Sequence, residues 1–394
     1  MNMKSTIDTA IDQHARRFIE ISRFIGENPE LGHEEWQASR RLMDELLHHG
    51  FDVQCPVLGL PTAFIGTYRS AKPGPVVAFL CEYDALPELG HACGHHIIGT
   101  MGVAAAVGLK AVIDELGGTI RVYGTPAEET KGAKVPMSAE GLFDDVDFAL
   151  MAHPYYTYEK SGESLAMDAV QFEYFGKAAH AAASPYEGVN ALDAVLLLFQ
   201  SVNALRQQVQ SHVRIHGIIT EGGKAANIIP DYAAAQFYIR SGNRLYTDEV
   251  VQKVLRCAEG AALQTGCTLK TSNYEFSYDE LITNNTLSDL FTRNLVSMGV
   301  REEEIQVGKD HGSVDLGNVS RHCPTIHPYI QVIDEKHLLH TKEFRDLAML
   351  DRAFEGMLLG AKALAHTACD AVSDPAVLKA IRDEFAKSLE TSGA

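Results

Sequence analysis

A run of histidines around one cysteine, Gly90-His91-Ala92-Cys93-Gly94-His95-His96, directly precedes a long apolar segment. Thiolate sulfur and imidazole nitrogen are ligands that zinc and other late divalent metals prefer in proteins. A Cys-x-His pair in extended backbone points both side chains to one side, so Cys93 and His95 could hold one metal ion. The alternative, a small buried cysteine beside surface histidines at a helix start, fits this motif alone equally well.

Two adjacent glutamates, Glu128 and Glu129, follow a predicted buried strand at residues 119–124. Neighbouring carboxylates repel one another unless a cation or a proton lies between them. If one binds a metal and the other accepts the proton of a metal-bound water molecule, the pair supplies both parts of a hydrolytic mechanism. A solvated acidic loop is the commoner fate of such a pair, but its position at a strand end favours the metal.

Two further histidines, His153 and His340, are isolated in the sequence. Each alone is more often a hydrogen-bonded structural residue than a ligand. Together with Cys93, His95 and Glu129 they make five ligands, enough to hold two metal ions if a ligand or a hydroxide bridges them.

The elements that must position these side chains alternate between strands and helices. Alternation of this kind implies parallel strands joined by right-handed crossovers, and ligands of such sheets bind at the carboxyl ends of the strands. The candidate ligands follow Cys81, Gly124 and Met151, which end three predicted strands. We predict strands at 62–68, 76–81, 119–124 and 147–151, short strands at 325–326 and 329–333, and helices at 5–25, 34–48, 97–116, 344–366 and 374–388.

The pattern changes near residue 165 to alternating β segments with two helices. The order β-α-β-β-α-β is that of a split βαβ sandwich, and the segments are expected at 165–175, 188–208, 213–220, 233–240, 248–265 and 268–276. We therefore predict an inserted α+β, ferredoxin-like domain at 165–277. The first domain, 1–164, is then completed by residues 278–394.

Composition and charge restrict the classes of protein. Hydrophobic residues make up 46% of the 394 residues, enough for a sizeable core, and the formal net charge of −18 disfavours nucleic acid and anionic membranes as partners. We expect no export signal, because charged residues interrupt the first 25 positions, and no apolar run near the roughly 18 residues of a membrane helix. Seven scattered cysteines fit a reducing cytosol, so a cytoplasmic protein is expected.

Six motifs occur in the order found in peptidase family M20, amidohydrolase subfamily D, and the chain resembles that group from about Glu34 to Phe344. The group includes auxin-conjugate hydrolases, aminobenzoyl-glutamate hydrolases and related dipeptidases. The resemblance implies a zinc-peptidase-like, three-layer α/β catalytic domain with an inserted lid and dimerisation domain. The motifs are His91-Ala92-Cys93-Gly94-His95, Pro126-Ala127-Glu128-Glu129, Met151-Ala152-His153-Pro154, Gly176-Lys177-Ala178-Ala179-His180-Ala181, Asn227-Ile228-Ile229-Pro230-Asp231 and His340-Thr341.

The resemblance also implies a cofactor and a catalytic group. Two divalent metal ions are expected, zinc or manganese, with cobalt and nickel as further options. Glu128 would be the general base and later the acid, and Asp84 would orient a ligand, although a simple loop carboxylate is the alternative for Asp84. The implied metal ligands are Cys93, His95, Glu129, His153 and His340.

Three residues of the inserted domain are implied to contact the substrate. His180 would reach the active site of the partner subunit in a homodimer and stabilise the oxyanion; a turn histidine is the alternative. Asn227 and Arg240 would bind the amide and carboxylate of the substrate, although an arginine at a strand end is often simply solvated. An exposed sheet edge in this domain would favour pairing between two copies.

The chain departs from the subfamily pattern at three places. His96 stands where the subfamily has Asp or Asn, and such a change beside a ligand can alter its basicity. Residues 130–134 replace a more glycine-rich stretch, and residues 312–320 fit the dipeptidase branch better than the auxin-conjugate branch. No ligand role is assigned to the histidines crowded near that last segment, His311, His322, His327 and His337.

We therefore expect a metal-dependent amidohydrolase, or dipeptidase-like metallopeptidase, acting on an N-acyl amino acid or dipeptide with a free carboxylate. A metal-activated hydroxide would attack the amide, with Glu128 as base. The alternatives are an auxin-conjugate-type aryl-acyl amino acid hydrolase, an aminobenzoyl-glutamate or basic-dipeptide specificity, and a non-catalytic metal- or peptide-binding descendant. A NAD-dependent dehydrogenase is disfavoured because no Gly-x-Gly-x-x-Gly run follows a predicted strand.

Overall fold

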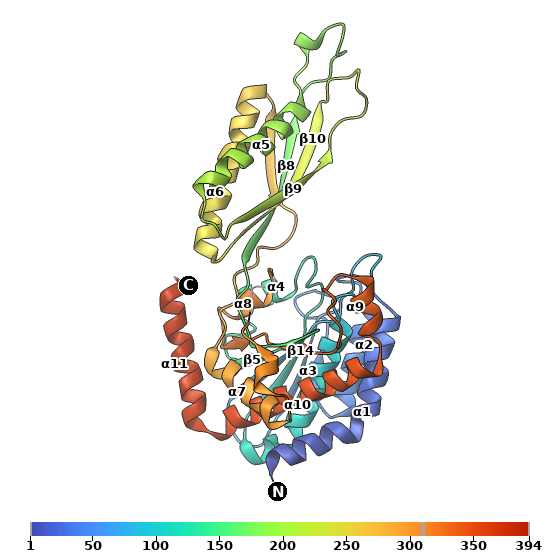
Figure 1. Cartoon of the computed structure of the whole chain (residues 1–394), viewed down its shortest axis with the longest axis vertical. Helices are drawn as coiled ribbons and strands as arrows, with labels where there is room; N and C mark the ends of the chain where they lie inside the picture. Colours follow the sequence, from blue (N-terminus) through green and yellow to red (C-terminus); the bar gives the residue numbers. More distant parts are fainter. Residues whose placement is uncertain (1, 309–311, 393–394) are drawn as a thin grey trace. The chain divides into compact units, whose positions relative to one another are not determined.

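The computed structural model describes residues 2–308 and 312–392. It divides into two compact units. Figure 1 labels their helices and some of their strands. Unit 1 comprises Met1–Glu163, Leu281–His311 and Asp315–Ala394, and unit 2 comprises Ser164–Glu280 and Gly312–Val314. The sequence analysis drew the inserted domain at 165–277 and did not include residues 312–314. Gly312 joins unit 2 because its carbonyl accepts the backbone N–H of Leu165 at 2.7 Å.

The main sheet of unit 1 has six strands in the order β1-β2-β4-β3-β5-β13. Strand β3 pairs in parallel with β4 and β5, and β13 pairs in parallel with β5, as the alternation of elements predicted. Strand β2 is instead antiparallel to β4, because the six residues between β2 and β3 are too few for a crossover helix and the chain reverses. The strands are β1 (Asp52–Gln54), β2 (Phe64–Arg69), β3 (Val76–Cys81), β4 (Thr119–Gly124), β5 (Phe148–Leu150) and β13 (Thr325–Ile326).

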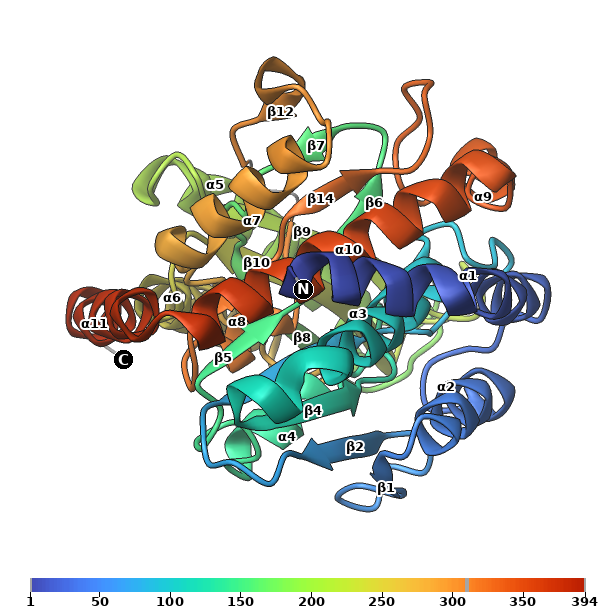
Figure 2. The same cartoon turned by 90° about the horizontal axis from the view of Figure 1, so that it is seen from below.

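Helix α3 (His95–Leu116) is the central helix of unit 1. It lies against β3 and β4, and α1 (Met3–Glu27) and α10 (Asp351–Ser373) pack on it (Figure 2). Gly102 permits the close approach to β3, since a Cβ there would lie 2.5 Å from Cys81 Sγ. The other helices of unit 1 are α2 (Trp36–His48), α4 (Lys134–Ala139), α7 (Asn285–Ser297), α8 (Leu316–Val319), α9 (Lys342–Leu347) and α11 (Pro375–Ser392).

The same helix corrects one expectation from the sequence. By length and composition α3 could cross a membrane, with a mean hydropathy of 1.7 over its most apolar window. The expectation that no apolar run approaches that length was therefore wrong. In the structure 89% of the window is buried inside the protein, because α3 is apolar on all sides and is enclosed by the sheet and by other helices.

A second, smaller sheet of unit 1 has the strand order β12-β7-β14-β6. His153 is the first residue of β6, so it belongs to a further strand that begins shortly after the end of β5. Its backbone is fixed there because β6 pairs in parallel with β14. The strands are β6 (His153–Tyr155), β7 (Tyr158–Glu159), β12 (Ile305–Gln306) and β14 (Tyr329–Gln331).

Unit 2 has the predicted β-α-β-β-α-β order, with an antiparallel sheet in the order β11-β8-β10-β9. Helices α5 and α6 pack against each other and against β8 and β10, and together they enclose an apolar core. Strand β9 is an edge strand and exposes Ile218 and Ile219, which are 63% and 41% accessible. The elements are β8 (Ala166–Phe175), α5 (Ala191–Leu205), β9 (Arg214–Glu221), β10 (Tyr232–Ser241), α6 (Arg244–Thr265) and β11 (Thr268–Asn273).

Candidate metal centre

The start of α3 places Cys93 and His95 on either side of a left-handed glycine. Gly94 has a φ of 79° and is the residue before the helix, so the backbone between the two donors turns there. The expected extended Cys-x-His geometry is therefore wrong. Glycine is required at this point, because it tolerates the positive φ and because a Cβ would lie 2.6 Å from Pro154 Cγ.

A tight loop after β4 carries Glu128 and Glu129. Ala127, the residue before them, has a φ of 64°, which is strained for a side chain with a Cβ. Its N–H donates to the buried carboxylate of Glu35 at 2.9 Å, and Glu35 is fixed in turn by the hydroxyl of Thr62 at 2.7 Å. The Glu129 N–H donates to Asp84 Oδ2 at 3.0 Å. Buried carboxylates from two other segments thus hold the backbone on both sides of Glu128.

His153 and His340 enter the site from two further segments. His153 donates through Nδ1 to the Pro154 carbonyl at 2.8 Å, which leaves Nε2 facing Cys93 Sγ at 3.5 Å. His340 lies at a φ of 62°, and its N–H donates to the Ala92 carbonyl at 2.9 Å. This bond ties the 340 segment to the cysteine loop, so that His340 Nε2 lies 3.1 Å from Glu129 Oε1.

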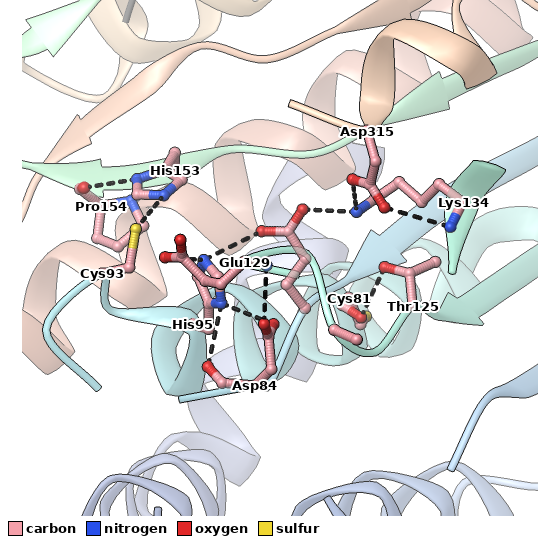
Figure 3. A network of polar contacts seen from close by, with 12 residues as sticks. Cys81, Asp84, Cys93, His95, Thr125, Glu129, Lys134, His153, Pro154 and Asp315 are labelled. Carbon is pink, nitrogen blue, oxygen red and sulfur yellow. Dashed lines mark hydrogen bonds and ion pairs between the residues drawn. The ribbon is translucent and has the colours of Figure 1, made fainter. Parts of the chain in front are cut away.

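The structure brings the five side chains named as ligands from the sequence into one cluster, shown in part in Figure 3. Within each of three overlapping groups, the donor atoms lie within 4.8 Å of one another. Two ligands of one tetrahedral zinc ion are about 3.4 to 3.6 Å apart, which matches the Cys93–His153 contact. The groups are Cys93-His95-His153, Cys93-Glu129-His340 and His95-Glu128-Glu129.

The orientation of His95 fits a metal ligand. Its Nδ1 donates to Asp84 Oδ1 at 2.8 Å, and a carboxylate of this kind commonly fixes the ring of a metal-binding histidine. Its Nε2 is buried and makes no hydrogen bond within the described part of the chain. It faces carboxylate oxygens of Glu82 at 3.5 Å and of Glu129 at 3.9 Å. A divalent cation between these atoms would satisfy the nitrogen and the carboxylates together.

The electrostatics of the site also favour a cation. Burial and the neighbouring Glu129 raise the pKa of both the Cys93 thiol and the Glu128 carboxyl well above their ordinary values. Burial alone would lower the pKa of His95, but Asp84 and Cys93 together outweigh it, so the pKa is raised well above its ordinary value. Groups that would each carry a negative charge are therefore crowded together and tend to keep their protons, and a bound dication would stabilise their ionised forms.

Three charged residues of this region were missed by the sequence analysis. Lys134 forms ion pairs with Glu82 and with Asp315, and all three side chains are fully buried. Figure 3 shows Lys134 and Asp315 beside the donor cluster. Glu82 also lies 3.5 Å from His95, measured between Oε2 and Nε2. A carboxylate at the end of β3 was the available signal for Glu82, whereas no local pattern joins Lys134 to Asp315.

The histidines left unassigned do not join the described donor groups. His96, which replaces the acidic or amide residue of the subfamily, is buried with Nε2 3.2 Å from the Ala348 carbonyl, and burial lowers its pKa to about 4. The ring of His327 is tilted against that of His153, with 5.5 Å between their centroids. His322 pairs with Asp144, and His337 pairs with Glu335. His311 lies outside the described residues.

The remaining candidates lie in unit 2 and are described there alone. His180 and Asn227 are neighbours, because residue 180 forms a β-bridge with Ile228 and the Ala181 N–H donates to the Asn227 carbonyl at 3.0 Å. His180 Nδ1 accepts the N–H groups of the two residues at 182 and 183, each at 3.2 Å. Arg240, on β10, lies over the ring of Tyr238 and reaches Ser313 Oγ at 3.4 Å.

An α/β fold with a cluster of sulfur, imidazole and carboxylate donors at its sheet edge defines a metallohydrolase, and the comparisons with known proteins specify the group. Residues 167–265 match the M20 profile described as the peptidase dimerisation domain. The chain is 40% identical to the Xaa-Arg dipeptidase of Mus musculus, over 96% of this chain and 91% of that protein. It is 29% identical to one of the p-aminobenzoyl-glutamate hydrolase polypeptides of Escherichia coli, over 98% of this chain and 95% of that protein.

A solved structure agrees in fold. A dinuclear metal-binding peptidase of the M20 family from Bacillus subtilis superposes with a TM-score of 0.67 at 18% identity, over 92% of this chain and 99% of that one. The chain belongs to peptidase family M20. It is a metallo-amidohydrolase of that family.

The buried carboxyl of Glu35 predicts a pH-dependent stability. Burial, with a contribution from Asp84, raises its pKa from 4.5 to about 7. Between these values the folded state holds a proton that the unfolded state has lost, so this group destabilises the fold increasingly as pH rises through that window. Glu35→Gln keeps an acceptor for the Ala127 N–H and removes the effect. Relative to wild type, the variant should gain about 1 to 3 kcal/mol in unfolding free energy from about pH 4.5 to 7.

Urea denaturation of the metal-free protein across this pH range measures the effect. The matched control is Glu34→Gln, which removes the neighbouring exposed carboxylate. Its stability relative to wild type is expected to stay constant with pH. A pH-independent difference between Glu35→Gln and wild type would show that Glu35 is already ionised in the folded protein.

Proposed function

We propose that this chain is a dipeptidase that hydrolyses dipeptides with a free carboxylate and a basic C-terminal residue. One observation carries the proposal. Five candidate metal donors lie in three overlapping groups, one of which contains Glu128, in a chain that is 40% identical to an Xaa-Arg dipeptidase over nearly its whole length. The donor cluster would supply the hydrolytic chemistry, and the similarity supports the substrate class.

The five donors would hold two divalent metal ions. Three side chains each belong to two of the three donor groups: Cys93, His95 and Glu129. The groups therefore overlap, and two ions bound in them would lie side by side in one cluster. Thiolate and imidazole favour zinc, whereas the carboxylate and imidazole donors also admit manganese, cobalt or nickel. When bound, the ions polarise the amide carbonyl and acidify a water molecule.

Glu128 is the proton carrier in this proposal. It lies beside Glu129 in the His95-Glu128-Glu129 group, and its raised pKa means that its surroundings favour a bound proton. It would accept a proton from the attacking water and then deliver it to the leaving amine. Asp84 does not meet the substrate in this scheme. It orients His95 through Nδ1 and fixes the backbone of Glu129.

The residues of unit 2 would complete the site in a homodimer. The family match of residues 167–265 to a dimerisation domain and the exposed apolar edge of β9 support two copies pairing through this unit. His180 of one subunit would then stabilise the oxyanion formed in the other. Asn227 and Arg240 would bind the substrate amide and carboxylate, since an amide and a guanidinium suit those groups.

Charge favours a basic substrate. The chain carries a formal net charge of −18, and an acidic protein attracts cationic ligands. A second candidate, p-aminobenzoyl-glutamate hydrolysis, is favoured by the 29% identity to the Escherichia coli hydrolase polypeptide. The two candidates differ in the sign of the side chain on the released amino acid, so they can be separated directly.

A hydrolysis panel tests the activity and the substrate class. Dipeptides ending in Arg or Lys should give kcat/KM at least about tenfold above p-aminobenzoyl-glutamate and indole-acetyl amino acids, because one well-placed charge contributes about 1.4 kcal/mol or more. Glu128→Gln should reduce kcat by about 10² to 10⁴-fold on every substrate cleaved, with metal content unchanged. Chelation should abolish turnover, and adding the metal back should restore it.

The matched control for this panel is Glu140→Gln, which alters an exposed glutamate just after α4. It should leave kcat unchanged. Full activity in Glu128→Gln with metal bound would contradict the role of Glu128, and faster cleavage of p-aminobenzoyl-glutamate would replace the substrate class with the second candidate.

The action of His180 across the dimer is tested by complementation. Glu128→Gln and His180→Ala homodimers should each be nearly inactive. After subunit exchange, a mixed dimer contains one site with an intact Glu128 and an intact partner histidine. We expect recovery of about one quarter of wild-type activity, because about half the dimers are mixed and half of their sites are complete. No recovery despite verified exchange would place His180 outside the partner's site.

A further inference from the structure

The centre of the buried ion network in unit 1 is Lys134, the first residue of α4. Its Nζ donates to Glu82 Oε1 at 2.7 Å and to Asp315 Oδ1 at 2.5 Å, and all three side chains are at most 2% exposed. Asp315 Oδ2 also accepts the backbone N–H of Lys134 at 3.2 Å. Burial alone would lower the pKa of Lys134, but Asp315 and Glu82 outweigh it, so the ammonium stays charged.

The loop before α4 is built to let Asp315 reach this lysine. A Cβ at Gly132 would lie 2.3 Å from Asp315 Oδ2, so any larger residue there would displace the carboxylate. Asp315 precedes α8, and α8 packs against α4. Two short helices from distant parts of the sequence therefore align one ammonium group, and they direct it at Glu82.

The other oxygen of Glu82 faces the donor cluster. Glu82 Oε2 lies 3.5 Å from His95 Nε2, the buried nitrogen that has no hydrogen bond within the described residues. Two ligand atoms on one tetrahedral ion, with bonds of about 2.1 Å, are about 3.4 Å apart. The distance between Glu82 and His95 is thus that of two ligands of one ion, while Lys134 binds the second oxygen of Glu82.

We propose that Lys134, aligned by Asp315, is a positioning residue that restrains Glu82 beside the metal centre and prevents it from becoming a further metal ligand. The inference rests on the proposed function. A hydrolytic zinc site keeps one coordination position for water or substrate, whereas a structural site has all its positions filled by protein. A released Glu82 would fill the open position. The ammonium competes for the same carboxylate and keeps the position open.

The test is Lys134→Met, which removes the ammonium and keeps a long side chain. We expect the metal-free variant to bind Zn²⁺ or Mn²⁺ about tenfold more tightly than wild type in calorimetric titrations, because Glu82, no longer held by the ammonium, can bind the metal. We expect kcat to fall about tenfold with a smaller change in KM, because the open position is filled. Tighter metal binding together with slower turnover is a result that a merely structural lysine would not give.

Glu82→Gln shows whether the gain in affinity comes from Glu82. Added to Lys134→Met, it should return metal affinity to within about threefold of wild type, since an amide is a poor ligand. Alone, it should also leave the affinity within about threefold. Weaker or unchanged metal binding in Lys134→Met would overturn the proposal. A large loss of affinity in Glu82→Gln alone would also overturn it, because Glu82 would then already be a ligand.

Two further variants control for folding and for the removal of a lysine. Lys4→Met removes a partly buried lysine paired with Asp370 at 2.7 Å, outside the donor cluster, and should change stability but not metal affinity. If Lys134→Met does not fold by circular dichroism and gel filtration, Asp315→Asn replaces it and should shift affinity and kcat in the same directions. Shifts in other directions would contradict the proposal.

Wild-type titrations separate this inference from the proposed function. A wild-type chain that binds no divalent metal overturns both. If the wild type binds metal and hydrolyses dipeptides but Lys134→Met and Asp315→Asn show no gain in metal affinity, the proposed function stands. Only the inference that Lys134 restrains Glu82 is then overturned.

Discussion

The repulsion between acidic groups gathered in one place is the constraint on which the rest of unit 1 depends. At one edge of the sheet lie Glu82, Asp84 and the Cys93 thiol, which are buried, and Glu128 and Glu129, which are partly buried, so each negative charge there is costly. Lys134 neutralises part of this charge, and a metal pair would neutralise more. The surrounding fold holds together groups that would repel one another and separate in water. A cation that binds between them relieves this repulsion, and the relief adds to the free energy of cation binding.

The topology explains how residues distant in sequence reach that edge. Strands β3, β4 and β5 run parallel, so the segments that follow them end on the same side of the sheet. Local backbone features then aim the donors. A left-handed Gly94 turns the chain between Cys93 and His95, and positive φ values at Ala127 and His340 are held by hydrogen bonds from other loops.

Sequence reasoning predicted which side chains gather, because strand ends are local properties and the order of motifs resembles one family. The residues beside Cys93, Glu129 and His153 did not decide between a ligand and a structural role. Sequence reasoning misjudged the backbone at Gly94 and the pairing of β2, because both are decided by packing against other segments. It could not find the Lys134–Asp315 pair, since 181 residues separate the two partners and neither stands in a recognisable motif.

The central claim is that these five donors hold two metal ions around Glu128. Crystals of the wild-type protein, soaked with zinc or manganese and measured at the absorption edge of the metal, test it most directly. The account predicts two anomalous peaks, each within about 2.5 Å of donor atoms of Cys93, His95, Glu129, His153 or His340. Peaks confined to other residues, or a cluster that remains empty at saturating metal, would contradict it.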